Sequence, residues 1–82
     1  MSLRLDELPL RRRAMISAID WDGIGPAEAK RLREFGFDEG VAVENLHTGP
    51  IGGDPIACRV GRMTIALRRR VALAISVVEA TA

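Results

Sequence analysis

The sequence predicts a mainly β fold: a small β-barrel of about five strands, with one α-helix inserted after the first strand. Three observations support this prediction. Short runs in which apolar and polar residues alternate recur along the chain, and this period-two pattern is typical of strands buried on one face. One stretch, residues 26–35, instead has the spacing of a helix with one apolar side. Finally, 82 residues can bury only a small core, and closing the sheet into a barrel removes its exposed edges without requiring a thick core.

The N-terminal part of the chain is expected to supply an arm, a strand and a turn. Leucines recur around a proline between residues 3 and 10. This predicts an arm or a single turn packed by its leucines, because proline prevents a long helix. Residues 12–19 should form the first strand, with a bulge near Ala18 that brings Ile19 inward. Residues 20–23 have the composition of a turn.

The helix is expected to span Pro26–Phe35. Proline is well tolerated at the first helical position, because its missing N–H would have no partner there. Ala29, Leu32 and Phe35 recur every third residue and form one apolar stripe. Gly36 can adopt the left-handed conformation that commonly ends a helix. The pattern therefore predicts both the helix and its termination.

Further strands are expected in the second half of the chain, separated by glycine-rich or basic segments. Their expected ranges are 41–47, 56–60, 64–67 and 73–78. Between the first two of these strands lies a Gly/Pro-rich stretch, residues 48–55. This stretch is interpreted either as a plain long hairpin loop or as a mobile recognition element, since loops on small rigid barrels often carry function.

The composition narrows the class of protein. A net charge of +1 with 28% charged residues indicates neither a nucleic-acid binder nor an acidic tail. The single cysteine rules out an intrachain disulfide, which is compatible with a reducing cytoplasm. No apolar run approaches the ~20 residues that span a bilayer, and the N-terminus lacks the apolar core of a signal peptide. We therefore expect residues 1–82 to form one soluble, cytoplasmic domain.

The motifs follow one another in a specific order. The residues concerned are Leu32, Gly36, Phe37, Gly40 and Val43, then Gly53, Asp54, Pro55, Ile56 and Val60, then Ile65, Ala66, Leu67, Arg68 and Arg69. This order resembles the FeoA family, the small cytosolic ferrous iron transport A proteins of bacteria, and the likeness extends over about residues 5–79. The resemblance implies an SH3-like small β-barrel.

The same resemblance implies a partner and a role. The partner is a FeoB-type ferrous iron permease, a membrane protein with a cytoplasmic GTPase domain. Through protein–protein contacts with that GTPase domain, the chain would modulate iron uptake and be peripheral to the membrane only through its partner. A different reading is a regulatory or metal-sensing domain, related to the C-terminal domain of iron-dependent repressors, that binds metal, peptide or nucleic acid. A third is a homo-oligomer formed through an uncovered strand edge, for example 73–78.

The sequence offers few groups for catalysis or for metal binding. Iron and zinc sites require several His, Cys or carboxylate ligands, whereas this chain has one histidine and one cysteine. Cys58 occupies an inward strand position, where a thiol behaves as a small hydrophobe, and Asp54 before proline is more typical of a turn. His47, Asp54 and Cys58 are therefore only weak metal candidates. Because no nucleophile has an evident base, we expect no enzyme activity, no catalytic residues and no cofactor.

Surface residues are the remaining candidates. The candidate partner-binding residues are Trp21, Arg68, Arg69, Arg70, Pro50 and Ile51. The tryptophan lies between two acids and is either an interface anchor or a lid over one end of the barrel. The arginine run is either a solvated strand end that prevents edge pairing or a positive patch that docks an acidic partner. Nucleic acid is not expected, because few aromatic side chains are available for stacking.

Overall fold

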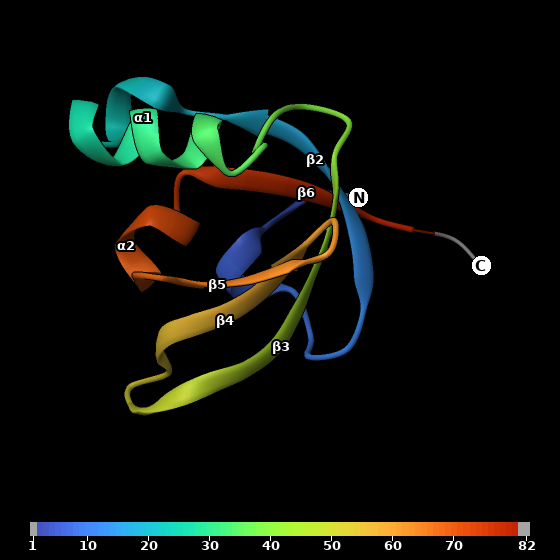
Figure 1. Cartoon of the computed structure of the whole chain (residues 1–82). Coiled ribbons are helices and arrows are strands. Elements are labelled where there is room, and N and C mark those ends of the chain that lie inside the picture. Colours follow the sequence, from blue (N-terminus) through green and yellow to red (C-terminus); the bar gives the residue numbers. More distant parts are fainter. Residues whose placement is uncertain (1, 81–82) are drawn as a thin grey trace.

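A computed structural model of the chain describes residues 2–80. Within this range, six strands form one antiparallel sheet in the order β1-β6-β2-β3-β4-β5. The strands are β1 Ser2–Arg4, β2 Arg13–Ile19, β3 Ala42–Ile51, β4 Asp54–Val60, β5 Met63–Leu67 and β6 Ile75–Glu79. The sheet curves around one buried cluster and forms a small barrel, as Figure 1 shows. The mainly β prediction is confirmed, with one more strand than expected.

Helical segments connect several of these strands. They are η1 Leu5–Glu7, η2 Trp21–Gly23, α1 Pro26–Glu34 and α2 Arg69–Ala72. Figure 1 shows α1 along the top of the barrel and the β3–β4 hairpin reaching away from it at the bottom. Because the short β1 precedes β2, the helix follows the second strand rather than the first.

The end of α1 confirms the role of its glycine. Gly36 has a φ of 90°, in the left-handed region. The N–H of Gly36 donates to the carbonyl of Arg33, and the N–H of Phe37 donates to the carbonyl of Leu32; both N···O distances are 3.0 Å. This pair of hydrogen bonds is the Schellman arrangement. It turns the chain so that Phe37, which is 1% exposed, enters the core.

The bulge expected in β2 is present. Pairing with β6 shifts register between Ile16 and Ala18. Beyond the shift Ala18 is exposed and Ile19 is half-buried, because one additional residue exchanges the two faces of a strand. The predicted inward turn of Ile19 is therefore confirmed, and Ala18 is the residue moved outward.

The prediction of a long loop at residues 48–55 is wrong. β3 continues to Ile51, which pairs directly with Asp54 at the start of β4. Only Gly52 and Gly53 form the turn, with φ values of 62° and 77°. Two successive left-handed residues are what a two-residue hairpin requires, and glycine adopts them without steric cost. The Gly/Pro content of this stretch thus belongs to a tight hairpin rather than to a long loop.

Gly49 allows the two strands of this hairpin to approach. A Cβ atom at this position would lie 2.4 Å from the backbone carbonyl oxygen of Asp54. We therefore expect Gly49→Ala to lower the free energy of unfolding by about 1–3 kcal/mol, because backbone must move to relieve the overlap. Urea denaturation measures the change. Gly25→Ala is the control, since its Cβ would meet no atom within 4 Å; equal effects of the two variants would contradict the explanation.

The C-terminal part of the barrel also differs from expectation. The basic run does not simply end a strand, because Arg69–Ala72 form the helical turn α2 before β6 begins. β6 lies between β1 and β2, so the expected uncovered edge at 73–78 is wrong. The N-terminal arm, which includes β1, covers that edge, and the two edges of the sheet are β1 and β5.

Asn45 fastens the N-terminal arm to the sheet. Its side chain is almost completely buried, and its Nδ2 donates to the carbonyl oxygens of Leu5 at 2.8 Å and Leu8 at 3.4 Å. Both leucines belong to the arm and are buried in the core, as the sequence predicts for a leucine-packed turn.

We expect Asn45→Ala to lower the free energy of unfolding by about 1–3 kcal/mol, because the two carbonyls would lose a buried donor. Amide hydrogen exchange should accelerate in residues 2–10 more than in β4. His47→Ala, an exposed position of the same strand, is the control and should change stability little. Unchanged exchange in the arm would contradict the anchoring role.

Candidate functional site

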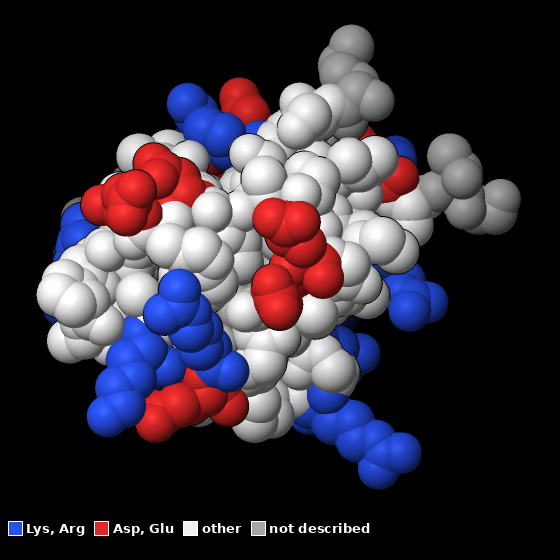
Figure 2. All heavy atoms as spheres, turned by 90° about the horizontal axis from the view of Figure 1, so that it is seen from above, with Lys and Arg blue, Asp and Glu red and all other residues white. Residues whose placement is uncertain are grey.

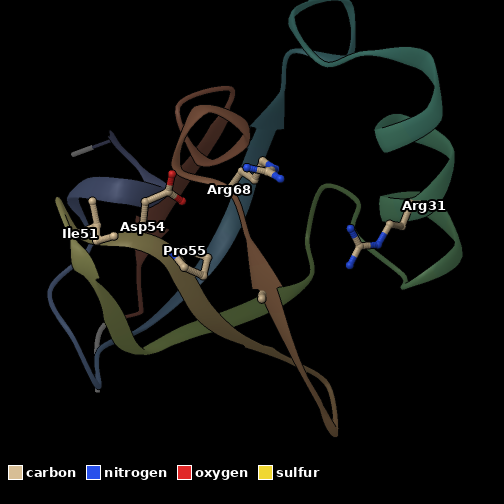
Figure 3. Close-up of a pocket in the computed structure, with 6 residues that line it drawn as sticks. Arg31, Ile51, Asp54, Pro55 and Arg68 are labelled. Carbon is tan, nitrogen blue, oxygen red and sulfur yellow. The ribbon is translucent and has the colours of Figure 1, made fainter.

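A hollow of about 520 Å³ separates α1 from the β3–β4 hairpin. We call it the hairpin groove. Its lining residues are Arg31, Ile51, Asp54, Pro55, Ala66 and Arg68. Figure 3 shows these side chains coming from α1 on one side, from the hairpin on the other, and from β5 and the segment after it in between.

The hairpin wall of the groove is held by Arg69. The backbone N–H of Arg69 donates to Oδ1 of Asp54 at 2.9 Å, and its Nη1 donates to the carbonyl of Gly52 at 2.8 Å. Its guanidinium also lies 3.8 Å from the carboxylate of Asp6, whose side chain is 2% exposed. Arg69 thus joins the hairpin, α2 and the N-terminal arm.

The three arginines of the basic run, residues 68–70, make different contacts. Arg69 makes the contacts just described, and Arg70 forms an ion pair with Glu28 of α1. Arg68 lines the hairpin groove. Two of these candidate partner-binding residues therefore make contacts within the chain, and the third faces the hollow.

The groove combines positive charge with apolar surface. Arg31 and Arg68 both point into the space between α1 and β5 in Figure 3. The acid of the groove, Asp54, already accepts a hydrogen bond from the backbone of Arg69. Ile51 is 81% exposed at the rim. Such a surface suits a ligand with a carboxylate and an apolar side chain, since arginine binds carboxylates with paired hydrogen bonds.

The other expected residues of the hairpin and of the turn lie outside this groove. Pro50 is exposed beside Ile51, but does not line the hollow. Trp21 is half-buried against the core, and the guanidinium of Arg33 lies 4.3 Å from the centre of its ring. Arg31 and Arg33 are two residues apart on α1 and so point about 200° apart around the helix axis. The tryptophan is therefore on the far side of α1 from the hairpin groove.

The candidate metal ligands do not converge. Cys58 pairs with Asn45 on the inner face of the barrel and is 0% exposed, whereas His47 pairs with Ala57 and is exposed. Burial raises the pKa of the Cys58 thiol to about 11, opposed by a smaller effect of a backbone hydrogen bond at Glu44. Metals bind the thiolate, which this environment disfavours. Among residues 2–80, no three His, Cys, Asp or Glu side chains gather in a way that could hold a metal ion.

Charge on the rest of the surface is mixed. On the face seen in Figure 2, basic and acidic side chains form small separate clusters between uncharged areas, so this face carries no continuous basic field. Across residues 2–80, none of the helices is both long enough and apolar enough to cross a membrane.

Sequence reasoning missed three of the six groove residues as site candidates: Arg31, Pro55 and Ala66. Arg31 has the pattern of an ordinary water-facing position of the helix, and only the fold brings it opposite Arg68. Ala66 did leave a signal, because the alternation in β5 places it outward and its small side chain leaves space beside the strand. A small residue on an outer strand face is a weak signal by itself.

Comparisons with known proteins identify similar chains. The family model of the FeoA domain matches residues 3–79. A search among curated proteins gave no match.

Among solved structures, FeoA from Chlorobium tepidum is 31% identical, with a TM-score of 0.80 over 92% of this chain and 68% of that one. FeoA from Stenotrophomonas maltophilia, an SH3-domain protein solved in complex with zinc, is 38% identical, with a TM-score of 0.75 over 94% of this chain and 88% of that one. A manganese-dependent transcriptional repressor shares the fold alone, at 19% identity and a TM-score of 0.81 over 96% of this chain and 42% of that one. The predicted SH3-like small barrel is thereby confirmed.

Proposed function

Since this chain belongs to the FeoA family, we propose that it is a cytoplasmic accessory protein of ferrous iron uptake. It acts by binding the cytoplasmic GTPase domain of a FeoB-type permease, and it reaches the membrane only through this partner. The observation that carries the proposal is the FeoA domain match over residues 3–79. In this proposal residues 1–82 are one binding domain with no catalytic step of their own. The related Stenotrophomonas maltophilia protein has itself been put forward as a ferrous iron transport activating factor.

The geometry supports action by contact. A groove with two arginines and an exposed isoleucine offers an interface, while the histidine and the cysteine lie on opposite faces of the sheet. Arginine is enriched at the hot spots of protein interfaces, and an exposed isoleucine gains free energy when a partner removes it from water. The barrel is therefore better equipped to hold a protein segment than to hold an ion.

A calorimetric titration tests the proposal. The purified chain is titrated into the cytoplasmic domain of the cognate permease, loaded with GDP or with a non-hydrolysable GTP analogue. Saturable binding with one chain per domain is the expected result, and an unrelated small GTPase is the control. Absence of binding in both nucleotide states, by a chain with a normal melting transition, would refute the proposal.

A second candidate is a regulatory or metal-sensing domain. The fold of the manganese-dependent repressor favours it, since this chain covers 96% of its own length in that superposition. This candidate predicts binding to a DNA fragment in a gel-shift assay at physiological salt, or binding of ferrous ion in an anaerobic titration. Tight binding in either assay would favour it over the permease partner, and its absence in both would leave the first proposal.

A further inference from the structure

We infer that the hairpin groove and the free edge of β5 bind an extended segment of a partner protein, one that alternates acidic and apolar residues, as an added β-strand. The inference goes beyond the proposed function, because it concerns the chemistry that this surface recognises and holds for any partner that carries such a segment. Three features of the described residues carry it: an unpaired strand edge, two arginines, and an apolar wall.

The strand edge comes first. Among residues 2–80, β5 is the last strand of the sheet and pairs only with β4. Val60 and Met63 flank the tight turn that precedes β5 and form a hydrogen-bonded pair, so alternate residues beginning with Thr64 should direct their backbone groups away from β4. Those residues are Thr64 and Ala66, both exposed. Their N–H and C=O groups are the ones that a further strand would pair with.

This edge faces the groove rather than open surface. Ala66 is both a residue of β5 and a lining residue of the hollow. In Figure 3, β5 lies between the hairpin and α1, and the space beside it is bounded on the far side by Arg31. A strand laid along β5 would therefore enter the groove, where its side chains contact both walls.

The charge of the groove selects an acidic segment. Arg31 and Arg68 come from different elements and enter the same hollow, so their like charges repel unless an anion lies between them. Asp54 is the one acid among the six lining residues and offsets only one of the two positive charges, so the lining keeps a net charge of +1. A carboxylate on the added strand would enter the hollow that both arginines line.

The hairpin wall of the groove selects apolar side chains. Ile51 and Pro55 supply this surface, Ala66 of β5 continues it, and Ile51 is 81% exposed. Side chains of an extended segment alternate between two directions. In the bound segment, glutamate or aspartate directed at the arginines thus alternates with valine, isoleucine or leucine directed at this apolar surface.

Two other occupants fit less well. Single-stranded nucleic acid requires aromatic stacking platforms, and none of the six lining residues is aromatic. A second copy of this chain, paired through its own β5, would bring further arginines toward the same edge, and like charges across a strand pair are destabilising. An acidic protein segment meets neither objection.

The test uses synthetic peptides and the intact protein. The probe is a capped eight-residue peptide that alternates glutamate and valine, followed by two-dimensional ¹H–¹⁵N NMR; its lysine–valine counterpart is the matched control. The amide signals of Thr64, Ala66 and Arg68 should shift with the acidic peptide, and the lysine peptide should bind at least tenfold more weakly. A peptide N-methylated at alternate residues should also lose at least tenfold, because it cannot complete the strand pairing.

Variants of the protein separate the groove from general charge. Arg31→Glu and Arg68→Glu should each weaken binding at least tenfold, whereas Arg33→Glu, on the other side of α1, should change it less than twofold. Melting curves confirm that each variant is folded. Equal binding of the two peptides, shifts confined to the surface around Trp21, no response of the β5 amides at millimolar peptide, or peptide-independent dimerisation through β5 would each overturn the inference. Because no permease is present, the outcome is independent of the calorimetric titration that tests the proposed function.

Discussion

Replacing Phe37 with alanine is expected to lower the free energy of unfolding by about 3–5 kcal/mol. Phe37 has the largest of the fully buried side chains described in the barrel, and it is 1% exposed. Removing its ring costs both the transfer free energy of the lost atoms and the cavity that they leave. Small domains are stable by only about 5–15 kcal/mol, so this one substitution should bring the protein close to unfolding at 37 °C.

Phe35→Ala is the matched comparison, because Phe35 lies two residues earlier and is only half-buried. Phe35→Ala should lower the free energy of unfolding by distinctly less than Phe37→Ala. Chemical denaturation of the two variants, followed by circular dichroism, measures the difference. Similar destabilisation by both substitutions would mean that Phe37 does not occupy the centre of the core.

The position of Phe37 shows what the sequence could predict. A helix that begins at proline and ends at glycine, followed by phenylalanine, contains its own start, stop and packing signals. These signals act over a few residues, and the structure confirms them. The inward residues of β4 and β6 were predictable for the same reason, since alternation along one strand needs no knowledge of its neighbours.

The β3–β4 hairpin shows why other parts could not be predicted. Glycine and proline usually mark loops, but Gly49 is required here because the opposing strand passes too close for a Cβ atom. That reason lies in Asp54, on the other strand, and is invisible to a local pattern. β1 was missed similarly, because three residues pair with β6 at the far end of the chain.

The candidate site depends on long-range placement even more. Of the partner-binding residues expected from the sequence, only Ile51 and Arg68 line the hairpin groove. Their neighbours in the groove come from α1 and from β5, and no spacing in the sequence connects these elements. The buried role of Asn45 could have been predicted more easily, since alternation in its strand places this polar residue inward beside Val43. A polar side chain at an inward position is a signal for a buried hydrogen bond.

Cys58 provides the second large effect, through pH. Burial raises the pKa of its thiol from the ordinary value of 9.0 to about 11 in the folded chain. Between these two values the unfolded chain has lost the thiol proton while the folded chain still holds it, so the unfolded state is favoured as the pH rises. The contribution of Cys58 is complete below pH 9 and falls by about 2–3 kcal/mol as the pH passes through 11.

The composition makes this window unusually clear. Tyrosine and lysine ordinarily titrate in the same range, and this chain has no tyrosine and one lysine. Urea denaturation at several pH values between 8 and 11 should therefore show a decline in stability that largely disappears in Cys58→Ala, although that variant starts lower because it loses a buried sulfur. An equally steep decline in the variant would contradict the assignment. A folded thiol that reacts with a disulfide reagent at pH 8 as fast as in urea would contradict it independently, since only an accessible thiolate reacts.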